Sequence, residues 1–278
     1  MTKRTLLDVA ALTVAAVVVA LNLRVVSDAA SGVASGVLKR HYRRTLFAEL
    51  KPVALANCTL ARFGHSHDGG YLMCANLLGN VRSAYSYGIE GRDEWGCAVG
   101  RTVGVPVHQY DCFVTMRPEC PGATFIFHEE CVGDRPTNAE GRAFDTLDRQ
   151  VARNGDGERH LAVKMDIEGA EWQVLRAAPD DTLARIDQLV IEFHETDQRH
   201  FVEVIRRLKR TFVVAHVHFN KAACHDGVRP FPSRAYEVLF VNKRISMIDP
   251  GGAAPEPPVI GLDSPNYPNR PDCQAAWH

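Results

Sequence analysis

The stretch that decides the expected fold is Lys164-Met165-Asp166-Ile167-Glu168-Gly169-Ala170-Glu171-Trp172. The apolar residues just before it predict a buried strand, and a helical spacing of apolar residues follows it. Gly169 lies at the strand-to-helix turn, where a residue without Cβ tolerates any backbone dihedral. Asp166 and Glu168 are therefore expected at the carboxyl end of a parallel strand, the edge at which open α/β sheets bind ligands. Glu171 fits the first helical turn, where an acid complements the helix dipole.

The composition of the 278-residue chain indicates a globular protein with one sizeable domain. Hydrophobic residues make up 46% of it, and the formal net charge of −1 argues against a broad basic surface for nucleic acid. The eight cysteines include no Cys-x-x-Cys pair, which disfavours a zinc ribbon or a thioredoxin-like motif. Two interpretations of the cysteines stay open: they pair in an oxidising compartment, or they are small buried hydrophobic residues.

The N-terminal residues 6–26 are apolar apart from a few polar positions, and Lys3 and Arg4 precede them. This pattern is typical of a signal peptide or a signal anchor. The flanking charges give a mixed orientation signal, because basic residues also follow the segment. Together with the cysteine count, the segment predicts a membrane-anchored protein with its domain in the secretory-pathway lumen or outside the cytoplasm. Residues 37–50 predict a basic amphipathic helix.

From residue 82 onward, strand-like runs alternate with helical patterns, as in a parallel sheet. Strands are expected at 82–89, 106–112, 123–128, 161–166 and 186–194. Helices are expected at 93–104, capped by Asp93, and at 143–153, 170–178 and 201–208. The last two runs, 212–219 and 235–241, are expected to pair as an antiparallel hairpin. This order predicts an α/β, Rossmann-like sheet of the class I methyltransferase kind, mostly parallel with a C-terminal antiparallel hairpin.

A cofactor site is expected at the ends of the first strands. Gly88 follows the first strand, where a glycine lets the backbone approach a ligand, and Asp111 ends the second strand about 20 residues later. An acid at that spacing is placed to hold ribose hydroxyls, although a strand-end cap explains Asp111 equally well. The third strand ends beside the second, where an adenine ring would lie. The cofactor-binding candidates are Tyr87, Gly88, Glu90, Gly91, Asp111, Cys131, Val132 and Asp166.

Several motifs together resemble the methyltransferase-like group related to the FkbM-type S-adenosylmethionine-dependent methyltransferases. They are Asp68-Gly69-Gly70-Tyr71, Tyr85-Ser86-Tyr87-Gly88-Ile89, Gly96-Cys97 ahead of Asp111, Lys164 to Trp172, and Ile191-Glu192-Phe193-His194. The resemblance covers about residues 58–243. It implies a Rossmann-like fold, S-adenosylmethionine as methyl donor, and transfer to a hydroxyl group, often of a sugar. The family usually carries an acid two residues before the first-turn glycine. In this chain that position is occupied by Ser86.

The catalytic candidates are His194, Asp166 and Glu192. Glu192 and His194 are two residues apart on the fifth strand and share a face, so they should meet Asp166 and Glu168 along one edge. Removal of a hydroxyl proton suits His194, whose imidazole has an unperturbed pKa of about 6.5, and Asp166 would position the acceptor. Three carboxylates this close repel one another unless one is protonated or a hard cation joins them, so Mg²⁺ held by Asp166, Glu168 and Glu192 is a further expectation. A strand cap through hydrogen bonds is the alternative for Glu192 and His194.

These observations leave three functions open. The first is an O-methyltransferase acting on a glycan or related acceptor. Its chain would divide into a signal anchor or transmembrane segment at 1–26, a stem at 27–57, a methyltransferase domain at 58–248 and a Pro-rich tail at 249–278. The second is a membrane-anchored glycosyltransferase, because Asp166-Ile167-Glu168 resembles an Asp-x-Asp metal motif. The third is a catalytically inactive binding module, which Ser86 keeps open. The expected partners are a hydroxyl-bearing acceptor and the membrane, and no nucleic acid.

Overall fold

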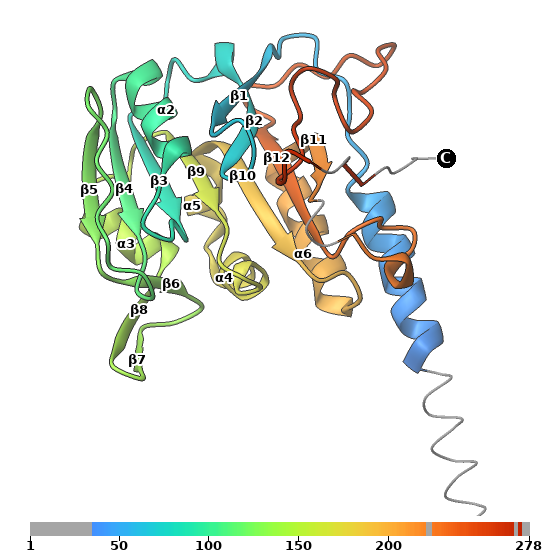
Figure 1. Cartoon of the computed structure of the whole chain (residues 1–278), viewed down its shortest axis with the longest axis horizontal. Helices are drawn as coiled ribbons and strands as arrows, with labels where there is room; N and C mark the ends of the chain where they lie inside the picture. Colours follow the sequence, from blue (N-terminus) through green and yellow to red (C-terminus); the bar gives the residue numbers. More distant parts are fainter. Residues whose placement is uncertain (1–34, 221–223, 270–271, 274–278) are drawn as a thin grey trace, which may run out of the picture.

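Seven strands of the part of the chain that the structure describes form one sheet (Figure 1). The computed structural model describes residues 35–220, 224–269 and 272–273. The strands are β3 (Ser83–Tyr87), β4 (Pro106–Tyr110), β5 (Thr124–His128), β9 (Leu161–Met165), β10 (Ile186–His194), β11 (Phe212–Phe219) and β12 (Ala235–Asn242). Their order is β11-β12-β10-β9-β3-β4-β5, and β12 runs antiparallel to both neighbours while the other pairs are parallel. The predicted α/β sheet, mostly parallel with an antiparallel C-terminal pair, is confirmed.

Helices and a short hairpin cover the two faces of this sheet. On one face, α2 (Glu94–Val103) packs with the hairpin of β1 (Leu60–Gly64) and β2 (Gly70–Cys74). The other face carries α3 (Leu147–Arg153), α4 (Glu171–Ala177) and α6 (Arg199–Thr211), and α5 (Asp180–Arg185) precedes β10. The Trp172 ring of α4 stacks between Phe193 and Phe201, with ring centroids 4.2 and 4.0 Å away. The helices predicted at 170–178 and 201–208 therefore meet in one core.

Both ends of α2 follow from the sequence. Asp93 Oδ1 accepts a hydrogen bond from the Gly96 amide at 2.7 Å, which is the expected N-cap. Gly104 ends the helix with a φ of 74°, a left-handed conformation that favours glycine. The helix predicted at 93–104 is confirmed.

The helix predicted at 143–153 begins only at Leu147. Residues Arg142–Thr146 form β8, which pairs with β6 (Cys131–Gly133) and β7 (Thr137–Ala139) in a small three-stranded sheet. A short apolar run is compatible with both a strand and a helix. Here residues 142–146 form a strand because they pair with β6 and β7. The correction matters for function because β6 and β8 border the cavity described below.

Cys58 and Cys74 clamp the β1–β2 hairpin through a disulfide. The polar residues between the strands form its turn. Arg62 holds this turn by donating to the carbonyl oxygens of His65 and His67. The hairpin thereby places Asp68 and Gly69 beside the cavity.

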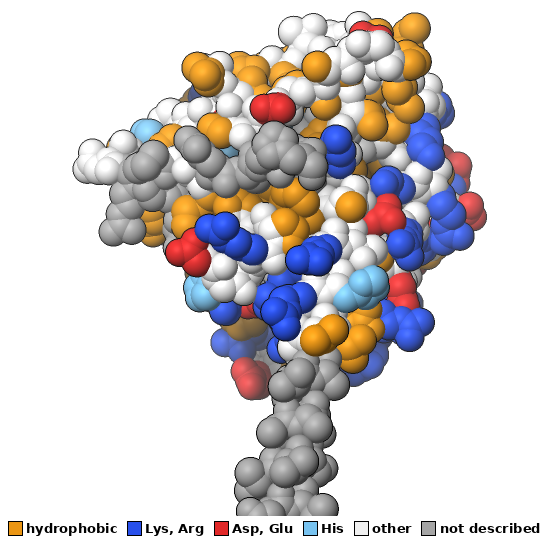
Figure 2. Space-filling model, turned by 90° about the vertical axis from the view of Figure 1, so that its right-hand side faces the viewer, with side chains coloured by type: hydrophobic (Ala, Val, Ile, Leu, Met, Phe, Trp, Pro, Cys, Tyr) orange, Lys and Arg blue, Asp and Glu red, His pale blue; other side chains and the backbone are white. Residues whose placement is uncertain are grey.

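The N-terminal helix is part of the domain. Residues 35–49 are helical, and Leu46, Phe47 and Leu50 are buried in the same core as α4 and α6. The opposite side carries exposed Lys and Arg side chains, and Figure 2 shows such side chains gathered around the point where the described chain begins. The predicted basic amphipathic helix is confirmed. The expected stem at 27–57 thus packs on the domain from residue 46 onward, and the expected anchor at 1–26 lies outside the described residues.

Part of the C-terminal segment, predicted as a Pro-rich tail, packs on the sheet. Asp263 Oδ1 lies 3.0 Å from His216 Nε2, and Asp272 Oδ1 lies 3.2 Å from His218 Nε2. The four side chains are buried. A disulfide between Cys224 and Cys273 fixes the end of the segment. Buried charges need such partners, so the two pairs and the disulfide explain why this Pro-rich segment is held against β11.

All eight cysteines are disulfide-bonded. The pairs are Cys58–Cys74, Cys97–Cys120, Cys112–Cys131 and Cys224–Cys273. Four disulfides indicate a domain that folds outside the reducing cytoplasm, which selects the first interpretation of the cysteines. Among the described residues, none of the helices has the length and apolarity needed to cross a membrane.

Candidate functional site

A cavity of about 490 Å³ opens at the carboxyl ends of β3, β4, β9 and β10. Its volume is in the range typical of small-molecule and cofactor sites. Of the residues predicted to bind the cofactor, all except Gly91 line it, and Glu168 and Glu192 line it as well. These lining residues are Tyr87, Gly88, Glu90, Asp111, Cys131, Val132, Asp166, Glu168 and Glu192. Gly91 instead lies under Met116, whose Cε would be 2.5 Å from a Cβ at that position.

The first-turn glycine is required by a contact between two strand ends. Gly88 has a φ of 70°, and a Cβ there would lie 1.7 Å from the carbonyl oxygen of Asp166. Lys164 Nζ donates to the carbonyl oxygen of Gly88 at 2.6 Å, which further ties β9 to the turn after β3. We expected this glycine to make room for a ligand. In the structure it makes room for the backbone of Asp166, and this close approach sets the shape of the cavity floor.

Asp111 organises two turns of the cavity wall. Its Oδ2 accepts from the backbone amides of Ile89 and Glu90 at 3.2 and 2.9 Å. Its Oδ1 accepts from the amides of Phe113 and Val114, both at 2.9 Å. These four bonds link the turn after β3 to the turn after β4. The contact of Asp111 with ribose hydroxyls stays a prediction.

An acid reaches the cavity beside Ser86 from the start of α2. Ser86 Oγ donates to Asp93 Oδ1 at 3.0 Å, and Gln109 Nε2 donates to Asp93 Oδ2 at 2.8 Å. Asp93 is buried and lines the cavity. Burial raises the pKa of Asp93, and the hydrogen bonds from Gln109 and the Gly96 amide oppose this rise. A carboxylate is therefore present next to position 86 in space, although the sequence showed Asp93 only as an N-cap.

His194 is oriented by a buried acid at the start of α4. Its Nδ1 lies 3.2 Å from Oε1 of Glu171, which is fully buried. The same oxygen accepts from two backbone amides of the strand-to-helix turn. With Nδ1 turned toward Glu171, Nε2 faces Glu168 Oε2 at 3.5 Å and Glu192 Oε1 at 3.8 Å. Glu171 thus does more than complement a helix dipole, because it fixes which nitrogen of the imidazole faces the other acids.

Asp166 and Glu192 complete this cluster. Asp166 Oδ2 accepts from the Tyr71 hydroxyl at 3.0 Å and lies 3.6 Å from Lys164 Nζ. Glu192 Oε1 accepts from Asn220 Nδ2 at 2.7 Å. One side-chain N or O atom from each of Asp166, Glu192 and His194 lies within 4.8 Å of the others. The structure therefore brings together the three residues predicted for catalysis.

Residues 133–214 match the protein family described as Methyltransferase FkbM domain. This stretch of the chain is therefore similar to the FkbM methyltransferase domain. The matched stretch includes β9, the turn with Asp166, α4 with Glu171, and β10 with His194. The protein is accordingly an S-adenosylmethionine-dependent methyltransferase, and the family match leaves its acceptor unspecified.

Two further comparisons add little to this family match. No curated protein matches the chain. Among solved structures, a crystal structure of Thermoplasma acidophilum 1320 matches with a TM-score of 0.32 and 12% sequence identity, over 60% of this chain and 81% of that one. A likeness this low does not bear on the fold.

Two groups of the methyltransferase site, His194 and Glu192, have raised pKa values. Burial lowers the pKa of His194, but the hydrogen bond and charge of Glu171, with the charges of Glu192 and Asp166, raise it to about 9. Burial and the charges of Asp166 and Glu237 raise the pKa of Glu192 well above its usual range. His194 is therefore mostly protonated at neutral pH in the free protein. The pKa of about 6.5 assumed from the sequence is wrong for this environment.

The methyltransferase site does not assemble the predicted Mg²⁺ ligands. The Glu168 side chain is 77% exposed, and the cluster of possible ligand atoms contains His194 in its place. Mg²⁺ prefers oxygen ligands in octahedral geometry, whereas this set includes an imidazole. The Lys164 ammonium also lies 3.6 Å from Asp166 and already balances part of the negative charge. These residues do not fit Mg²⁺, and no step of methyl transfer is assigned to it.

Two further residues of the methyltransferase site were missed from the sequence. Asn220, which directly follows β11, lines the cavity at the same carboxyl edge as Glu192. A polar residue just after a predicted strand was the signal that could have found it. Phe113 also lines the cavity although 67% of it is exposed, and the Arg142 guanidinium lies 4.5 Å from its ring centre. No local pattern marks Phe113, because its position depends on the turn that Asp111 holds.

Proposed function

We propose that this methyltransferase transfers the methyl group of S-adenosylmethionine (AdoMet) to a hydroxyl group, with His194 as general base. The observation that supports it is the arrangement of Glu171, His194 and Asp166 at the edge of a cofactor-sized cavity. Glu171 fixes the imidazole so that Nε2 takes the acceptor proton. Asp166, held by Tyr71 and Lys164, positions the acceptor hydroxyl. This arrangement supplies the orientation and proton removal that the reaction requires.

The proposed step is a single displacement. The acceptor oxygen forms a bond to the methyl carbon as the bond between that carbon and the sulfonium sulfur breaks. The hydroxyl proton moves to His194 Nε2, and S-adenosylhomocysteine (AdoHcy) leaves as a neutral thioether. Atoms and charge balance, because the positive charge of the sulfonium ends as an imidazolium.

Cofactor charge makes His194 a usable base. In the free protein the acids around His194 hold its pKa at about 9. AdoMet brings a positive sulfonium to the same cavity, and a nearby like charge disfavours the protonated imidazole. Binding of the cofactor therefore lowers the pKa of His194 toward neutrality and releases its proton before the acceptor arrives.

The proposed acceptor is a glycan or a related molecule rich in hydroxyl groups. Beyond the cofactor candidates, the cavity is lined by groups that exchange hydrogen bonds with hydroxyls, namely Asp68, Glu94, Glu192 and Asn220. The resemblance of the sequence motifs to sugar-modifying methyltransferases supports the same class. Both observations favour a polar acceptor over an apolar one.

Ligand binding separates this proposal from a glycosyltransferase. We expect the full chain to bind AdoMet and AdoHcy in a calorimetric titration and to give no heat with a panel of nucleotide sugars. The full chain is used because Leu46, Phe47, Leu50 and, near the C-terminus, Asp263, Asp272 and Cys273 pack on the domain. Binding of nucleotide sugars without binding of AdoMet would reverse the order of the two functions. An inactive binding module would bind AdoMet and form no methylated product.

In the same titration, Asp111→Ala should weaken AdoMet binding about ten-fold or more. Hydrogen bonds to a charged group contribute about 1.5–3 kcal/mol, and about 1.4 kcal/mol is one decade in affinity. The substitution removes the ribose contact and also the four bonds that hold the adjoining turns. Glu129→Ala, which removes an exposed acid after β5, is the control and should bind normally. Equal affinities in the two variants would remove Asp111 from the site.

Asp93→Asn tests whether Asp93 takes the place of the acid that position 86 lacks. We propose that its carboxylate holds the amino group of the methionine portion of AdoMet. Asparagine caps helices as well as aspartate, so the variant keeps α2 and removes only the charge. AdoMet binding should fall about ten-fold, because a hydrogen bond to a charged group is replaced by a neutral one. If binding of AdoMet and of its deaminated analogue fell equally, the amino-group contact would be refuted.

We further propose that residues 1–26 anchor this domain to a membrane, on the non-cytoplasmic side. The four disulfides support the compartment. The anchor itself rests on the apolar sequence at 6–26, which lies outside the described residues. The acceptor would then be a glycan or related molecule in the secretory pathway or at the cell surface.

A further inference from the structure

We propose that the Cys112–Cys131 disulfide holds the wall of the AdoMet pocket in its binding conformation, and that reduction of this disulfide weakens cofactor binding. The proposal rests on the AdoMet site proposed above and goes beyond it, because it makes cofactor affinity depend on the oxidation state of two cysteines. In this account the bond positions cofactor-binding residues in addition to stabilising the fold.

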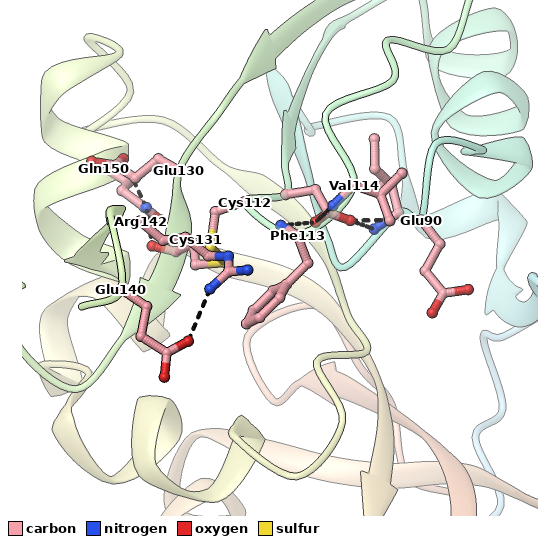
Figure 3. The surroundings of a disulfide bond; sticks show 11 residues. Glu90, Cys112, Phe113, Val114, Glu130, Cys131, Glu140, Arg142 and Gln150 are labelled. Atoms are coloured by element: carbon pink, nitrogen blue, oxygen red, sulfur yellow. Dashed lines mark hydrogen bonds and ion pairs between the residues drawn. A yellow bond between two sulfur atoms is a disulfide. The ribbon is translucent and has the colours of Figure 1, made fainter. Parts of the chain in front are cut away.

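The disulfide joins two walls of the cavity (Figure 3). Cys112 directly follows Asp111 after β4, and Cys131 begins β6. Cys131 lines the cavity itself, and Asp111 and Phe113 line it on either side of Cys112. The bond therefore lies within the wall that the ribose and adenine of the cofactor are expected to contact.

The two segments that the disulfide joins differ in how well the surrounding protein packs against them. On the Cys131 side, Gln150 of α3 donates to the carboxylate of Glu130 and to the carbonyl oxygen of Cys131, at 2.9 and 3.1 Å. On the other side, residues 113–119 are exposed or half-buried, and none of them is buried. The disulfide thus fastens a poorly packed loop to a well-held strand.

Asp111 extends this constraint to a second turn. The carboxylate that holds the amides of Phe113 and Val114 also holds those of Ile89 and Glu90. Freedom gained at Cys112 would therefore loosen the turns after both β4 and β3. A wall that is ordered before binding needs less ordering when the cofactor arrives, which increases affinity.

The chain offers a matched control for a disulfide that only stabilises the fold. Cys58–Cys74 closes a loop of similar length, with a sequence separation of 16 against 19 for Cys112–Cys131. Loop-closure entropy depends only weakly on loop length, so loss of either bond should destabilise the fold to a similar degree. Neither Cys58 nor Cys74 lines the cavity, and the hairpin that they clamp contributes Asp68, which is proposed above to face the acceptor, so AdoHcy affinity should depend little on this bond.

The test compares two double variants of the full chain, Cys112→Ser with Cys131→Ser and Cys58→Ser with Cys74→Ser. Titration calorimetry gives the Kd of AdoHcy, and thermal unfolding gives Tm. We expect similar losses of Tm, a Kd at least ten-fold higher for the first variant, and a Kd within about three-fold of wild type for the second. Equal Kd values in the two variants would overturn the proposal. If wild-type protein bound neither AdoMet nor AdoHcy, the proposed function itself would fail, and this inference with it.

Reduction of the wild-type protein gives a second test that needs no variant to fold. Dithiothreitol converts each disulfide to two thiols and is itself oxidised to a cyclic disulfide. Alkylation at intervals, followed by peptide mapping, reports which bond has opened. Because AdoHcy would bind the ordered wall and stabilise it, saturating AdoHcy should slow the opening of Cys112–Cys131 several-fold and leave that of Cys58–Cys74 unchanged. Equal protection of both bonds, or of neither, would refute the link between this disulfide and the pocket.

Discussion

His194→Ala should lower the turnover of methyl transfer by about 10²- to 10⁴-fold, the range that loss of a general base produces. The imidazole is the group whose Nε2 faces the cluster of acids, and Glu171 holds it there. The variant should still bind AdoMet, because His194 is not among the residues that line the cofactor cavity. Turnover is measured with radiolabelled AdoMet and a panel of glycan acceptors, and AdoMet binding is measured separately by calorimetry.

Two further variants make this result specific. Asp166→Asn should also lower turnover, because it removes the charge held by Lys164 and the acceptor for the Tyr71 hydroxyl. His200→Ala, a half-buried histidine on α6 that does not line the cavity, should behave as wild type. Near wild-type turnover in both His194→Ala and Asp166→Asn would rule out this constellation. Assays with and without a chelator should agree, since the donor set does not suit Mg²⁺.

The fold was predictable because the apolar runs in the sequence mark the strands and these strands follow the usual order of a doubly wound sheet. Apolar runs marked β3, β4, β5, β9 and β10, and a doubly wound sheet places their carboxyl ends on one edge. That rule was enough to predict that Asp166, Glu192 and His194 meet. It failed at 143–146, where a short apolar run suits a strand and a helix alike and only pairing with β6 decides.

The chemistry of the site depends on contacts that no local pattern encodes. Glu171 and His194 are 23 residues apart in sequence and come from α4 and β10. From the sequence, Glu171 resembles any acid in a first helical turn. Asp93 likewise carries the signature of an N-cap, and its contact with Ser86 depends on how α2 is set against β3. In both cases the residue fulfils a common local role and a site role at once, and only the first is visible in sequence.

The kcat/KM for AdoMet should rise with pH from about 7 to beyond 9, and Glu171→Gln should move this rise to lower pH. Burial lowers the pKa of His194, but Glu171, Glu192 and Asp166 together raise it to about 9. A base with a raised pKa is protonated below that value, so its active form grows as pH rises, reaches half at about pH 9 and grows further above it. The rise appears in kcat/KM, which reports the pKa of the free enzyme. Removal of the Glu171 charge takes away the first of the interactions that raise the pKa, so the neutral imidazole forms at lower pH.

Glu168→Gln is the matched control for this shift. Its carboxylate also lies within 3.5 Å of His194 Nε2, but the side chain is 77% exposed, so solvent screens its charge. Glu171 is fully buried, and its charge acts through a poorly screened interior. An NMR titration of the His194 ring follows the pKa without an acceptor. The pKa should fall clearly in Glu171→Gln and little in Glu168→Gln, while maximal turnover also drops in Glu171→Gln because the imidazole is less firmly oriented. Equal shifts in the two variants would show that general acidity of the cavity, rather than the buried Glu171, controls the base.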